Sequence, residues 1–357
     1  MKKTRVLVAM SGGVDSSVAA ARLFDAGFDV VGCTLHLWDY PEAGPGSHAR
    51  CCAPEDQYDA RRVADALGFP HFTFDRRALF AKNVVEPFVE AYVAGETPSP
   101  CTACNRTVKL GELFDIADKL GAELVATGHY ARVVDGRLHA GRDATKDQSY
   151  FLYATPPALL ARMTFPLGES TKEEVRAEAV ARKLPGATKG ESQELCFVGE
   201  GAGAYARFVE ERAKERLRPG PIVDETGRVV GRHDGVHRFT VGQRKGLGVA
   251  LGQPAFVTRI DAEDATVHVG TKADFRATSA TLRDVVLAPD VALPREALAR
   301  VRYRHAGVRA RVEGDVVRFL DPPGAVSRGQ VAVLYDGDRV LGGGVIGEVN
   351  VDAQVAT

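Results

Sequence analysis

Short apolar runs alternate with amphipathic segments through the first half of the chain. Arg5–Met10 has the continuous apolar pattern of a buried strand, and Ser16–Ala26 after it has the spacing of a helix. The alternation continues with strands expected at Val30–Leu35, His71–Phe74 and Leu124–Thr127, and with helices expected at Glu55–Leu67, Leu79–Ala94 and Val108–Leu120. Strands that alternate with helices predict βαβ units and a mostly parallel sheet.

Two local signals refine this picture. Ala131–His139 surrounds Asp135-Gly136, a dipeptide typical of tight turns, so a β-hairpin is expected there. Thr171 and Glu174 have the spacing of a capping box, which predicts a helix from that point to about Lys183.

The pattern changes after about Tyr205, where short alternating runs are separated by turn sequences. Strands are expected at Phe256–Ile260, Thr266–Val269, Val308–Val312 and Val316–Leu320. We therefore expect an α/β protein in three parts. A parallel-sheet domain would cover residues 1–206, a small mixed α/β domain 207–278, and a β-barrel-like domain 279–357.

The 357 residues include 46 Lys and Arg against 47 Asp and Glu, a formal net charge of -1. This balance argues against a strongly basic nucleic-acid coat protein, and charge alone does not indicate an RNA partner. No uninterrupted apolar stretch reaches about 18 residues, so we expect no membrane association. The six cysteines are too sparse for a disulfide scaffold and are expected to be cytosolic thiols. We expect a cytoplasmic protein that is a monomer.

A glycine-rich segment joins the first expected strand to the first helix. Ser11-Gly12-Gly13-Val14-Asp15-Ser16 places two glycines where backbone amides and a helix N-terminus favour an anion. Asp15 is unexpected in a pure anion site, because it repels phosphate. It fits if Mg²⁺ lies between its carboxylate and the phosphates, or if it caps the helix. The segment is neither a Walker A loop nor a dinucleotide-binding Gly-x-Gly-x-x-Gly.

Two cysteines follow a proline-rich segment. Cys101 and Cys104 come after Thr97-Pro98-Ser99-Pro100, whose prolines predict an extended approach. Cys104 is then expected just before the N-terminus of the helix that starts at Val108. That position, close to basic side chains, would lower the pKa of the Cys104 thiol and favour the thiolate.

Cys196, much further along the chain, leaves three interpretations open. Cys104 could act as a nucleophile with a sulfur-carrying Cys196, or Cys101, Cys104 and Cys196 could hold an iron–sulfur cluster with one open iron. Cys101-x-x-Cys104 could instead be half of a zinc site, which is disfavoured because no second Cys or His pair has the usual spacing. The remaining cysteines are expected at packing or turn positions: Cys33, Cys51 and Cys52.

The glycine-rich segment resembles the PP-loop of the ATP pyrophosphatases, which cleave ATP to AMP and pyrophosphate. With motifs along nearly the whole chain, the sequence resembles the tRNA-specific 2-thiouridylases (the MnmA family). These motifs are Cys51-Cys52 with Asp56, Cys104-Asn105, residues 126–132, residues 146–152, residues 192–197, residues 240–248, Arg302-Tyr303-Arg304 and Gly329-Gln330. The cysteine motifs and the Thr-Val-Gly-Gln-Arg-Lys-Gly-Leu-Gly string are the most specific of them.

The resemblance implies that ATP, with Mg²⁺, is bound by the loop and two further positions. The implied residues are Ala9, Met10, Ser11, Gly12, Gly13, Val14, Asp15, Ser16, Leu35 and Gly128. It implies Cys104 as the nucleophile and Cys196 as the persulfide carrier, with a transient disulfide between them, and Asp15 belongs to the same catalytic group. No protein-held metal site is certain, and an iron–sulfur cluster on Cys101, Cys104 and Cys196 stays an alternative.

A tRNA substrate and a persulfide donor protein, a cysteine desulfurase or relay protein, are also implied. Ser99, Pro100 and Cys101 would line the target uridine. Further expected tRNA contacts are His129, Lys146, Asp147, Gln148, Arg302, Tyr303, Arg304 and Gln330. Other basic candidates are Arg244, Lys245, Arg309 and Arg311, with a structural turn or a solvated strand face as the alternative. The chain departs from the family at Ser99, where Asn is usual, at Cys101, which is often Asp, and at Arg328, where Pro is common.

The implied reaction is ATP-dependent 2-thiolation of the wobble uridine in tRNAs with Lys, Glu or Gln anticodons. Uracil O2 is adenylated with release of pyrophosphate, and sulfur then enters C2 as AMP leaves. Another PP-loop ligase or amidotransferase, acting on a small molecule, would explain the loop but not the cysteines. A non-catalytic RNA-binding or sulfur-carrier protein would need no such loop.

Overall fold

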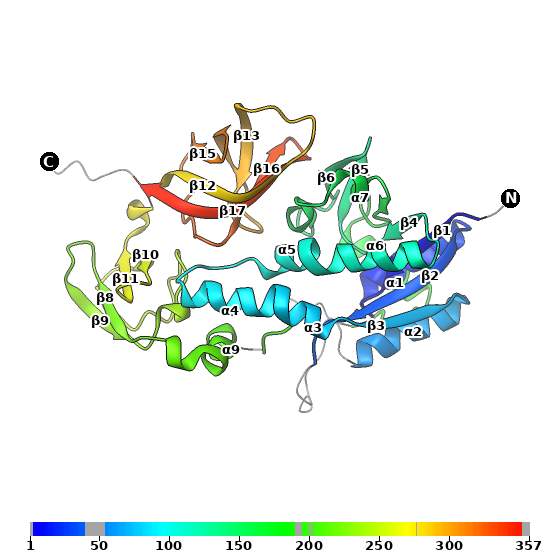
Figure 1. The fold of residues 1–357 in the computed structure, drawn as a ribbon, viewed down its shortest axis with the longest axis horizontal. Coiled ribbons are helices and arrows are strands. Elements are labelled where there is room, and N and C mark those ends of the chain that lie inside the picture. The colour runs from blue at the N-terminus through cyan, green and yellow to red at the C-terminus, as the bar shows by residue number, and fades with distance from the viewer. Residues whose placement is uncertain are drawn as a thin grey trace. The chain divides into compact units, whose positions relative to one another are not determined.

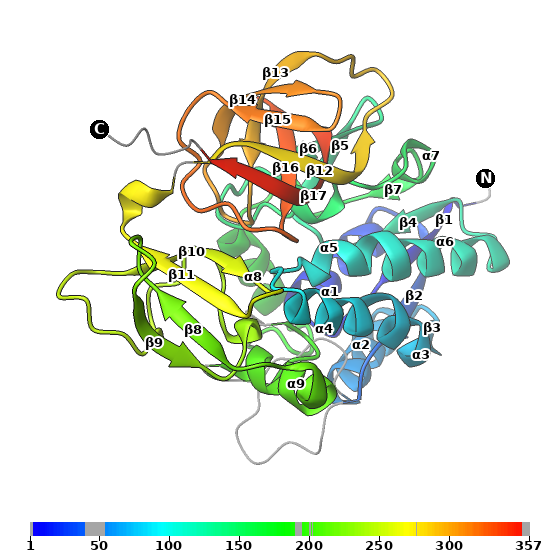
Figure 2. The same ribbon diagram turned by 60° about the vertical axis from the view of Figure 1, so that its left-hand side comes forward.

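The computed structural model describes residues 3–39, 54–189, 195–199, 201, 203–275 and 277–351. The chain forms two compact units, whose elements are labelled in Figures 1 and 2. Unit 1 comprises Met1–Val85, Pro100–Phe197 and Asp338–Val340, and unit 2 comprises Glu86–Ser99, Val198–Gly337 and Leu341–Thr357. Each unit is therefore assembled from segments that are distant in the sequence.

Unit 1 is built on a five-stranded parallel sheet with the strand order β3-β2-β1-β4-β7. Its strands are β1 (Arg5–Ala9), β2 (Asp29–His36), β3 (His71–Asp75), β4 (Leu124–Ala126) and β7 (Met163–Thr164). Val6 and Val8 of β1 are fully buried, as the apolar run predicts. The strand order reverses at β1, which has β2 on one side and β4 on the other. Open α/β sheets bind ligands beside such a point, at the carboxyl ends of the strands.

Helical segments accompany this sheet where helices were expected, and also at residues 149–152 and 157–160, where none was expected. They are α1 (Val14–Asp25), α2 (Pro54–Leu67), α3 (Arg77–Phe80), the π-helical η1 (Ala81–Val85), α7 (Pro157–Leu160), α8 (Lys172–Ala181) and the 3₁₀ turn η3 (Ser149–Leu152). α1 packs against α8 through Val18 and Val175. The capping box is confirmed, because Glu174 N donates to Thr171 Oγ1 and Thr171 N donates to the Glu174 carboxylate. Within the described residues, no helix is long and apolar enough to cross a membrane.

One local expectation is wrong. A helix, α5 (Pro100–Cys104), precedes the expected start at Val108, and the helical run continues through the π-helical η2 (Asn105–Lys109) into α6 (Leu110–Lys119). Figure 1 shows α5 and α6 along one rod. Pro100 is compatible with this start, because the first helical position needs no intrahelical N–H bond. Cys104 therefore lies inside a helical run, and the argument that an N-terminal dipole activates its thiol does not apply.

The expected hairpin is formed by β5 (Ala131–Val134) and β6 (Arg137–Ala140), with Asp135 and Gly136 at positive φ. Arg339, the first residue of β17 (Arg339–Val351), pairs with His139 of β6. The Asp338 carboxylate accepts a hydrogen bond from the guanidinium of Arg132 and lies 3.1 Å from His139 Nδ1. A segment close to the C-terminus thus completes one edge of the hairpin in unit 1.

Unit 2 contains a four-stranded sheet with the order β10-β11-β8-β9. Its strands are β8 (Gly220–Val223), β9 (Val229–His233), β10 (Phe256–Asp261) and β11 (Thr266–Gly270). The helices α4 (Glu86–Val93) and α9 (Ala204–Ala213) belong to the same unit and pack through Phe88 and Phe208. Short 3₁₀ turns are η4 (Lys214–Arg216), η5 (Val236–Arg238) and η6 (Lys272–Asp274).

The rest of unit 2 is a closed β-barrel. Its strands follow the order β12-β15-β14-β13-β16-β17, and β12 pairs with β17 to close it. They are β12 (Ala277–Leu287), β13 (Arg295–Arg300), β14 (Val308–Glu313), β15 (Val316–Phe319), β16 (Val331–Asp336) and β17. Alternate residues such as Val312, Leu334 and Ile346 fill its interior. The expected fold class is confirmed: an α/β domain with a parallel sheet is followed by a smaller domain and a C-terminal β-barrel.

Candidate functional site

The phosphate loop runs from the end of β1 to the start of α1. Gly12 has a φ of +75°, and a side chain there would collide with the backbone carbonyl of Asp56 at the start of α2. Ser11 N donates to Ser16 Oγ at 3.2 Å, while the hydroxyls of Ser16 and Ser17 donate to Gly13 O at 3.0 Å. The loop is therefore held in a fixed turn by its own hydroxyls, and glycine is required at position 12.

The other residues expected at ATP lie on neighbouring strands at the same edge. Met10 N donates to Cys33 O at 2.7 Å, which brings the loop beside Leu35, near the carboxyl end of β2. Gly128 follows β4, and a Cβ there would lie 2.9 Å from Ser16 N. The structure thus brings Ala9–Ser16, Leu35 and Gly128 together where the strand order reverses. Backbone amides and glycines at such an edge suit a nucleotide phosphate.

Asp15 does not cap α1, because the N-cap residue is Gly13 and Asp15 lies in the first turn. Its two carboxylate oxygens lie 2.7 and 2.8 Å from Lys172 Nζ, and the Tyr130 hydroxyl donates to Oδ1 at 2.9 Å. The Lys172 side chain is only 11% exposed. Sequence reasoning missed both partners. The capping box marked the start of α8 but gave no sign that its first residue reaches the phosphate loop.

This arrangement fits ATP with Mg²⁺. Mg²⁺ is usually held by one or two carboxylates together with substrate phosphates, and Asp15 is a carboxylate at the loop. Lys172 adds a cation within reach of the same place. A second cation, Lys189, pairs with Asp56 and Asp59 beside Gly186 and the loop. Burial lowers the pKa of Lys189, but its hydrogen bonds to Asp59 and Asp56 outweigh this and raise it.

The candidate nucleophile Cys104 is buried, with 4% of its surface exposed, at the end of α5. The π-helical η2 follows directly, and such turns are frequent at functional sites. The next residue, Asn105, is also buried; its amide nitrogen donates to Phe151 O at 3.2 Å, and its Oδ1 has no hydrogen-bond partner among the described residues. Cys104 is therefore held in a packed segment.

The other cysteines lie in different surroundings. Cys101 is exposed, Pro100 beside it is buried, and Cys196 is half-buried. Among the described residues, no three His, Cys, Asp or Glu side chains are grouped to hold a metal ion, so the three cysteines do not form a cluster ligand set in this conformation. Cys33 is buried in β2, and this burial raises the pKa of its thiol to about 12. Cys51 and Cys52 lie outside the described residues.

The tRNA contacts expected in unit 1 lie beside the phosphate loop. His129 follows Gly128, and its Nδ1 is 2.7 Å from Thr127 Oγ1. Burial, together with the charge of Lys109, lowers the pKa of His129 to about 3, so its ring is neutral at pH 7. Asp147 is buried and accepts hydrogen bonds from the amides of Gly141 and Ser149.

Gln148 and Lys146 are the neighbours of Asp147. Gln148 bonds Tyr130 twice, because Tyr130 N donates to its side chain and its own amide donates to Tyr130 O. Gln148 therefore braces the tyrosine that contacts Asp15. Lys146 is half-buried in the turn before it. Contacts of these residues with tRNA stay predictions.

Unit 2 holds the chain that leads to Ser99. Gln330 Nε2 donates to Thr97 O at 2.9 Å, and Thr97 N donates to Arg328 O at 2.8 Å. A side chain at Gly329, which has a φ of +83°, would meet Glu96 and Thr97. Residues 328–330 therefore fix the extended segment ahead of Ser99, so the structure gives Gln330 a local supporting role.

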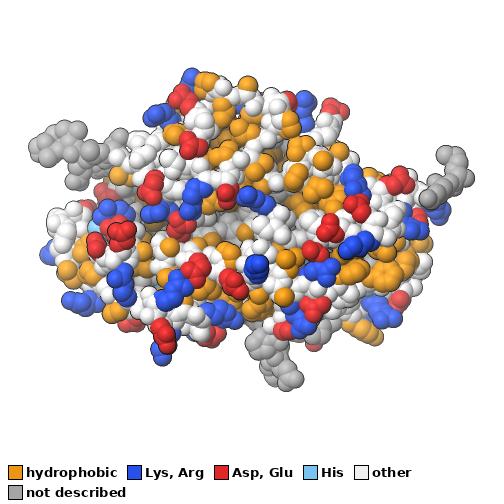
Figure 3. Space-filling model, in the orientation of Figure 1, with side chains coloured by type: hydrophobic (Ala, Val, Ile, Leu, Met, Phe, Trp, Pro, Cys, Tyr) orange, Lys and Arg blue, Asp and Glu red, His pale blue; other side chains and the backbone are white. Residues whose placement is uncertain are grey.

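The basic candidates of unit 2 divide into two groups. Arg309 bonds both carboxylate oxygens of Asp321 at 3.0 Å, and Arg311 pairs with Glu313 at 2.7 Å. Arg309 and Arg311 therefore fit the alternative to tRNA contact, a solvated strand face whose arginines pair with acidic side chains. The second group has no carboxylate partner within the described part of the chain and consists of Arg244, Lys245, Arg302 and Arg304, which we call the unpaired cations. On the face in Figure 3, basic and acidic side chains are interspersed.

A shared segment supports the loops that carry the unpaired cations. Arg302 donates to Ala325 O at 3.0 Å, and Ala325 packs against Gly242. Arg304 has a φ of +64°, and its guanidinium lies 5.5 Å from the ring centroid of Tyr303. Ser327 Oγ donates to Val241 O at 3.4 Å. The 302–304 turn and the 240–248 loop are therefore held together by residues 325–327.

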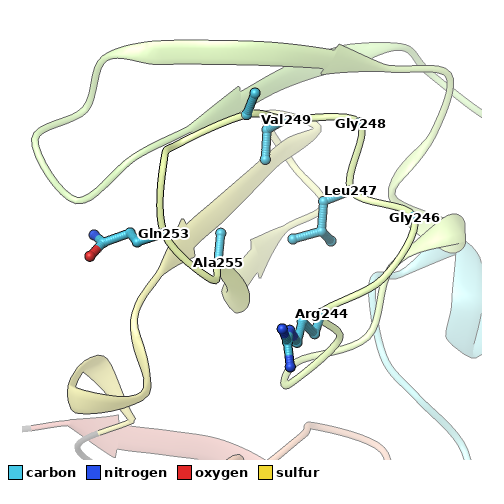
Figure 4. Close-up of a pocket in the computed structure, with 8 residues that line it drawn as sticks. Arg244, Gly246, Leu247, Gly248, Val249, Gln253 and Ala255 are labelled. Atoms are coloured by element: carbon cyan, nitrogen blue, oxygen red, sulfur yellow. The ribbon is translucent and has the colours of Figure 1, made fainter.

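The 240–248 loop also borders a pocket of about 380 Å³. Figure 4 shows Arg244 at this pocket, with Leu247 on the inner side of the loop and Gln253 pointing away. The Gln243 side chain accepts from Thr240 N and donates to Lys245 O, both at 3.0 Å. The loop is thus an ordered turn that also presents a cation.

Comparisons with known proteins agree along the chain. Three family models match, described as tRNA methyl transferase HUP domain (residues 4–200), tRNA methyl transferase PRC-barrel domain (206–271) and Aminomethyltransferase beta-barrel domain (278–346). The tRNA-specific 2-thiouridylase MnmA of Sorangium cellulosum is 63% identical over 96% of this chain and 92% of that protein. The protein of the same name from Moorella thermoacetica is 46% identical over 96% of this chain and 99% of its own.

Solved structures are more distant. A predicted subunit of tRNA methyltransferase from Methanocaldococcus jannaschii covers 60% of this chain and 88% of its own, with 19% identity and a TM-score of 0.34. A 4-thiouridine synthetase in complex with RNA and ATP covers 60% of this chain and 51% of its own, with 14% identity and the same TM-score. Likeness at this level carries no argument. The identities of 63% and 46% over 96% of the chain do show the family, so the chain belongs to the tRNA-specific 2-thiouridylase (MnmA) family.

Proposed function

We propose that this protein catalyses the ATP-dependent 2-thiolation of the wobble uridine of tRNA. The observation that carries the proposal is the 63% identity, over 96% of the chain, to a protein named tRNA-specific 2-thiouridylase. The phosphate loop and the two cysteines of unit 1 supply groups that this reaction needs. A cytoplasmic monomer that receives sulfur from a persulfide donor protein is part of the same proposal.

The first step is adenylation. A uracil C2 carbonyl is a poor electrophile, because its oxygen is a very poor leaving group. Transfer of the AMP moiety of ATP to O2 makes this oxygen part of a good leaving group, and pyrophosphate departs. The negative charge that develops on pyrophosphate requires donors, which the loop amides and Lys172 provide. Mg²⁺, bound with ATP beside Asp15, would add charge neutralisation at the phosphates.

The second step is sulfur transfer. The terminal sulfur of a Cys196 persulfide attacks C2, and AMP leaves with the former O2. The Cys104 thiolate then attacks Sγ of Cys196, so the bond between Sγ and the transferred sulfur breaks and a Cys104–Cys196 disulfide forms. The transferred sulfur, now bonded to C2, takes the electron pair of the broken S–S bond and becomes the sulfur of the 2-thiouridine. Reduction of the disulfide by a thiol returns the enzyme to its starting state.

The target base must leave its stack to reach this chemistry. RNA-modifying enzymes read unstacked bases of single-stranded loops, and an anticodon loop offers such a base. We place the base near Ser99, Pro100 and Cys101, and we place tRNA phosphates near the unpaired cations. tRNA affinity then comes from a local patch, which suits a chain with a net charge of -1.

The central test replaces the cysteines one at a time. Cys104→Ser and Cys196→Ser should each abolish thiolation of tRNA supplied with ATP and a persulfide source, scored by a mercury-gel shift. Pyrophosphate exchange into ATP should survive both changes, because adenylation needs neither thiol. Cys33→Ser is the matched control, since this thiol is buried in the sheet and serves packing. Normal turnover in either of the first two variants would contradict the two-cysteine scheme.

The iron–sulfur alternative has its own readout. A cluster on Cys101, Cys104 and Cys196 would give broad visible absorbance and stoichiometric iron in protein purified without oxygen. Among the described residues these three cysteines are not grouped as metal ligands, so we expect a colourless, iron-free protein that is active with a persulfide. A small-molecule PP-loop ligase would instead release pyrophosphate on its own substrate and leave tRNA unchanged.

A further inference from the structure

The residue after the candidate sulfur carrier is buried among aromatic rings. Phe197 is 4% exposed, and its ring centroid lies 5.5 Å from that of Phe80 and 6.2 Å from that of Trp38. Phe80 and Trp38 also contact each other at 6.2 Å, and all three pairs are edge-to-face. Edge-to-face pairs of buried rings favour one orientation. The Phe197 ring therefore has one defined position against Phe80 and Trp38, which we call the aromatic seat. Cys196, the residue before Phe197, is itself only half-buried.

The position of this seat is informative. Trp38 lies two residues after the carboxyl end of β2, and Phe80 is the last residue of α3. The carboxyl ends of parallel strands meet at one edge of a sheet, so Trp38 lies at the edge that also carries the phosphate loop and Gly128. By docking on Trp38, Phe197 brings Cys196 to the edge where we place ATP.

The helix that carries Cys104 contacts the segment that follows Phe80. Phe80 is followed immediately by η1, and α5, which ends with Cys104, contacts η1. The π-helical η1 and η2 also contact each other, and η2 begins directly after Cys104. The helical segment Arg77–Val85 therefore contacts both the aromatic anchor of Cys196 and the helix that ends with Cys104.

We infer that Phe197 is a positioning residue for sulfur transfer: by docking on Phe80 and Trp38, it holds Cys196 in reach of Cys104, whose helix contacts the same segment, Arg77–Val85. The inference rests on the proposed two-cysteine reaction. It explains how two residues far apart in the sequence can form a disulfide during turnover. It also separates the two steps, because Phe197 belongs to sulfur transfer and has no role in adenylation.

Disulfide formation gives a direct measure of this positioning. Two thiols lose two electrons and two protons when Cys104 and Cys196 join, and oxidised glutathione, as the electron acceptor, becomes two molecules of reduced glutathione. The equilibrium constant of this exchange is an effective concentration, which is high only when the two sulfurs are held close and oriented. It can be measured without tRNA, ATP or a sulfur donor.

The test compares three substitutions of phenylalanine by leucine in the full chain. Phe197→Leu and Phe80→Leu each remove one ring of the seat and should lower the effective concentration by about tenfold or more. Phe24→Leu is the matched control, since Phe24 is 38% exposed, packs on Phe69 and is outside the seat. Trp38 is the only tryptophan of the chain, so its fluorescence reports the loss of Phe197 from the seat.

Sulfur transfer to tRNA should fall with the effective concentration in both variants, while pyrophosphate exchange stays within about twofold of the parent, which also shows that unit 1 is folded. An unchanged disulfide equilibrium in both variants, or an equal loss of pyrophosphate exchange, would overturn the inference. Failure of the proposed function has a different signature. In that case Cys104→Ser or Cys196→Ser would retain thiolation, while Phe197→Leu would still shift the disulfide equilibrium.

Discussion

The phosphate loop of unit 1 and the cation-bearing loops of unit 2 handle charge in opposite ways. At the phosphate loop, Asp15 is bonded by Lys172 and Tyr130, and Lys172 is almost buried. On unit 2, Arg244 and Arg302 are exposed and have no carboxylate partner in the described residues. The first arrangement fixes charges before a ligand arrives. The second leaves cations available, although many neighbouring arginines are neutralised by acidic residues.

This difference indicates that the phosphate loop should control the chemistry and that the cations of unit 2 should control the affinity for RNA. Paired charges in a partly buried site are costly to disturb, because removal of one partner leaves the other without compensation. Exposed cations contribute little individually, and salt screens them, but several together attract a polyanion. Chemistry should therefore depend steeply on single residues of the phosphate loop, whereas RNA binding should depend shallowly on several residues of unit 2.

The largest effect should follow loss of Lys172. Lys172→Met removes the cation from Asp15 and from the departing pyrophosphate, and should lower pyrophosphate exchange by about a hundredfold or more. Lys172→Arg should recover part of the activity, because charge is restored in a different shape. Lys119→Met, an exposed lysine on α6, is the control and should behave like the parent. If Lys172→Met exchanged pyrophosphate into ATP as fast as the parent, the expectation that adenylation depends on single residues at the phosphate loop would be wrong.

Tyr130→Phe should have an intermediate effect at the same site. It deletes one hydrogen bond to Asp15 and leaves the Lys172 pair in place. A net hydrogen bond of about 1 kcal/mol corresponds to about a fivefold loss in pyrophosphate exchange. The measurement is a comparison of kcat and KM for ATP in the two Asp15-contact variants. A loss as large as that of Lys172→Met would mean that the hydroxyl has a role of its own.

The cations of unit 2 should show smaller, additive effects. Arg244→Ala and Arg302→Ala should each weaken tRNA binding and lower the slope of log affinity against log salt by about one unit. Arg309→Ala provides a matched arginine on the same unit that is already paired with Asp321, so it should change neither quantity. Binding measured over a range of salt concentrations distinguishes these outcomes. Equal losses in all three variants would show that pairing with a carboxylate does not decide which arginines contact RNA.

The smallest effect concerns pH and His129. The folded pKa is near 3 and the ordinary value is 6.5, so between these values the unfolded chain binds a proton that the folded protein does not. The contribution of His129 to stability is therefore present above pH 6.5 and declines as the pH falls through this window. The melting temperature of the parent should drop more than that of His129→Asn on acidification. Parallel curves for the two proteins would show that His129 is not held neutral.

Much of this arrangement was predictable from local sequence. The run Val6–Met10, the glycines of the phosphate loop and the Thr171–Glu174 capping box each specify structure through neighbouring residues, and the structure has them where they were expected. The start of α5 was missed because a proline pair suggests an extended chain, although proline also suits the first position of a helix. The local rule was correct up to Ser99, and tertiary packing decides the conformation of the next five residues, Pro100–Cys104.

Contacts between distant parts of the chain were not predictable in the same way. Lys172 reaches Asp15 across 157 positions, and nothing near either residue indicates the pair. The same holds for Gln330 and Thr97, and for Phe197 and Phe80. The family motifs did mark Gln330, but as an expected RNA contact, whereas its visible role is to hold the segment before Ser99. For Gln330, the sequence motif did not indicate which residues its side chain contacts.

The pairing of Arg339 with His139 has a consequence for synthesis of the protein. The hairpin β5–β6 emerges from the ribosome long before Asp338, the residue that accepts a hydrogen bond from Arg132 in the finished structure. Until Asp338 and β17 are synthesised, Arg132 lacks its Asp338 partner and β6 lacks its pairing with Arg339. Unit 1 is therefore completed only by β17, the last strand in the described part of the chain, and a fragment that stops after the parallel sheet would be left with an open β edge, exposed to pairing with another chain.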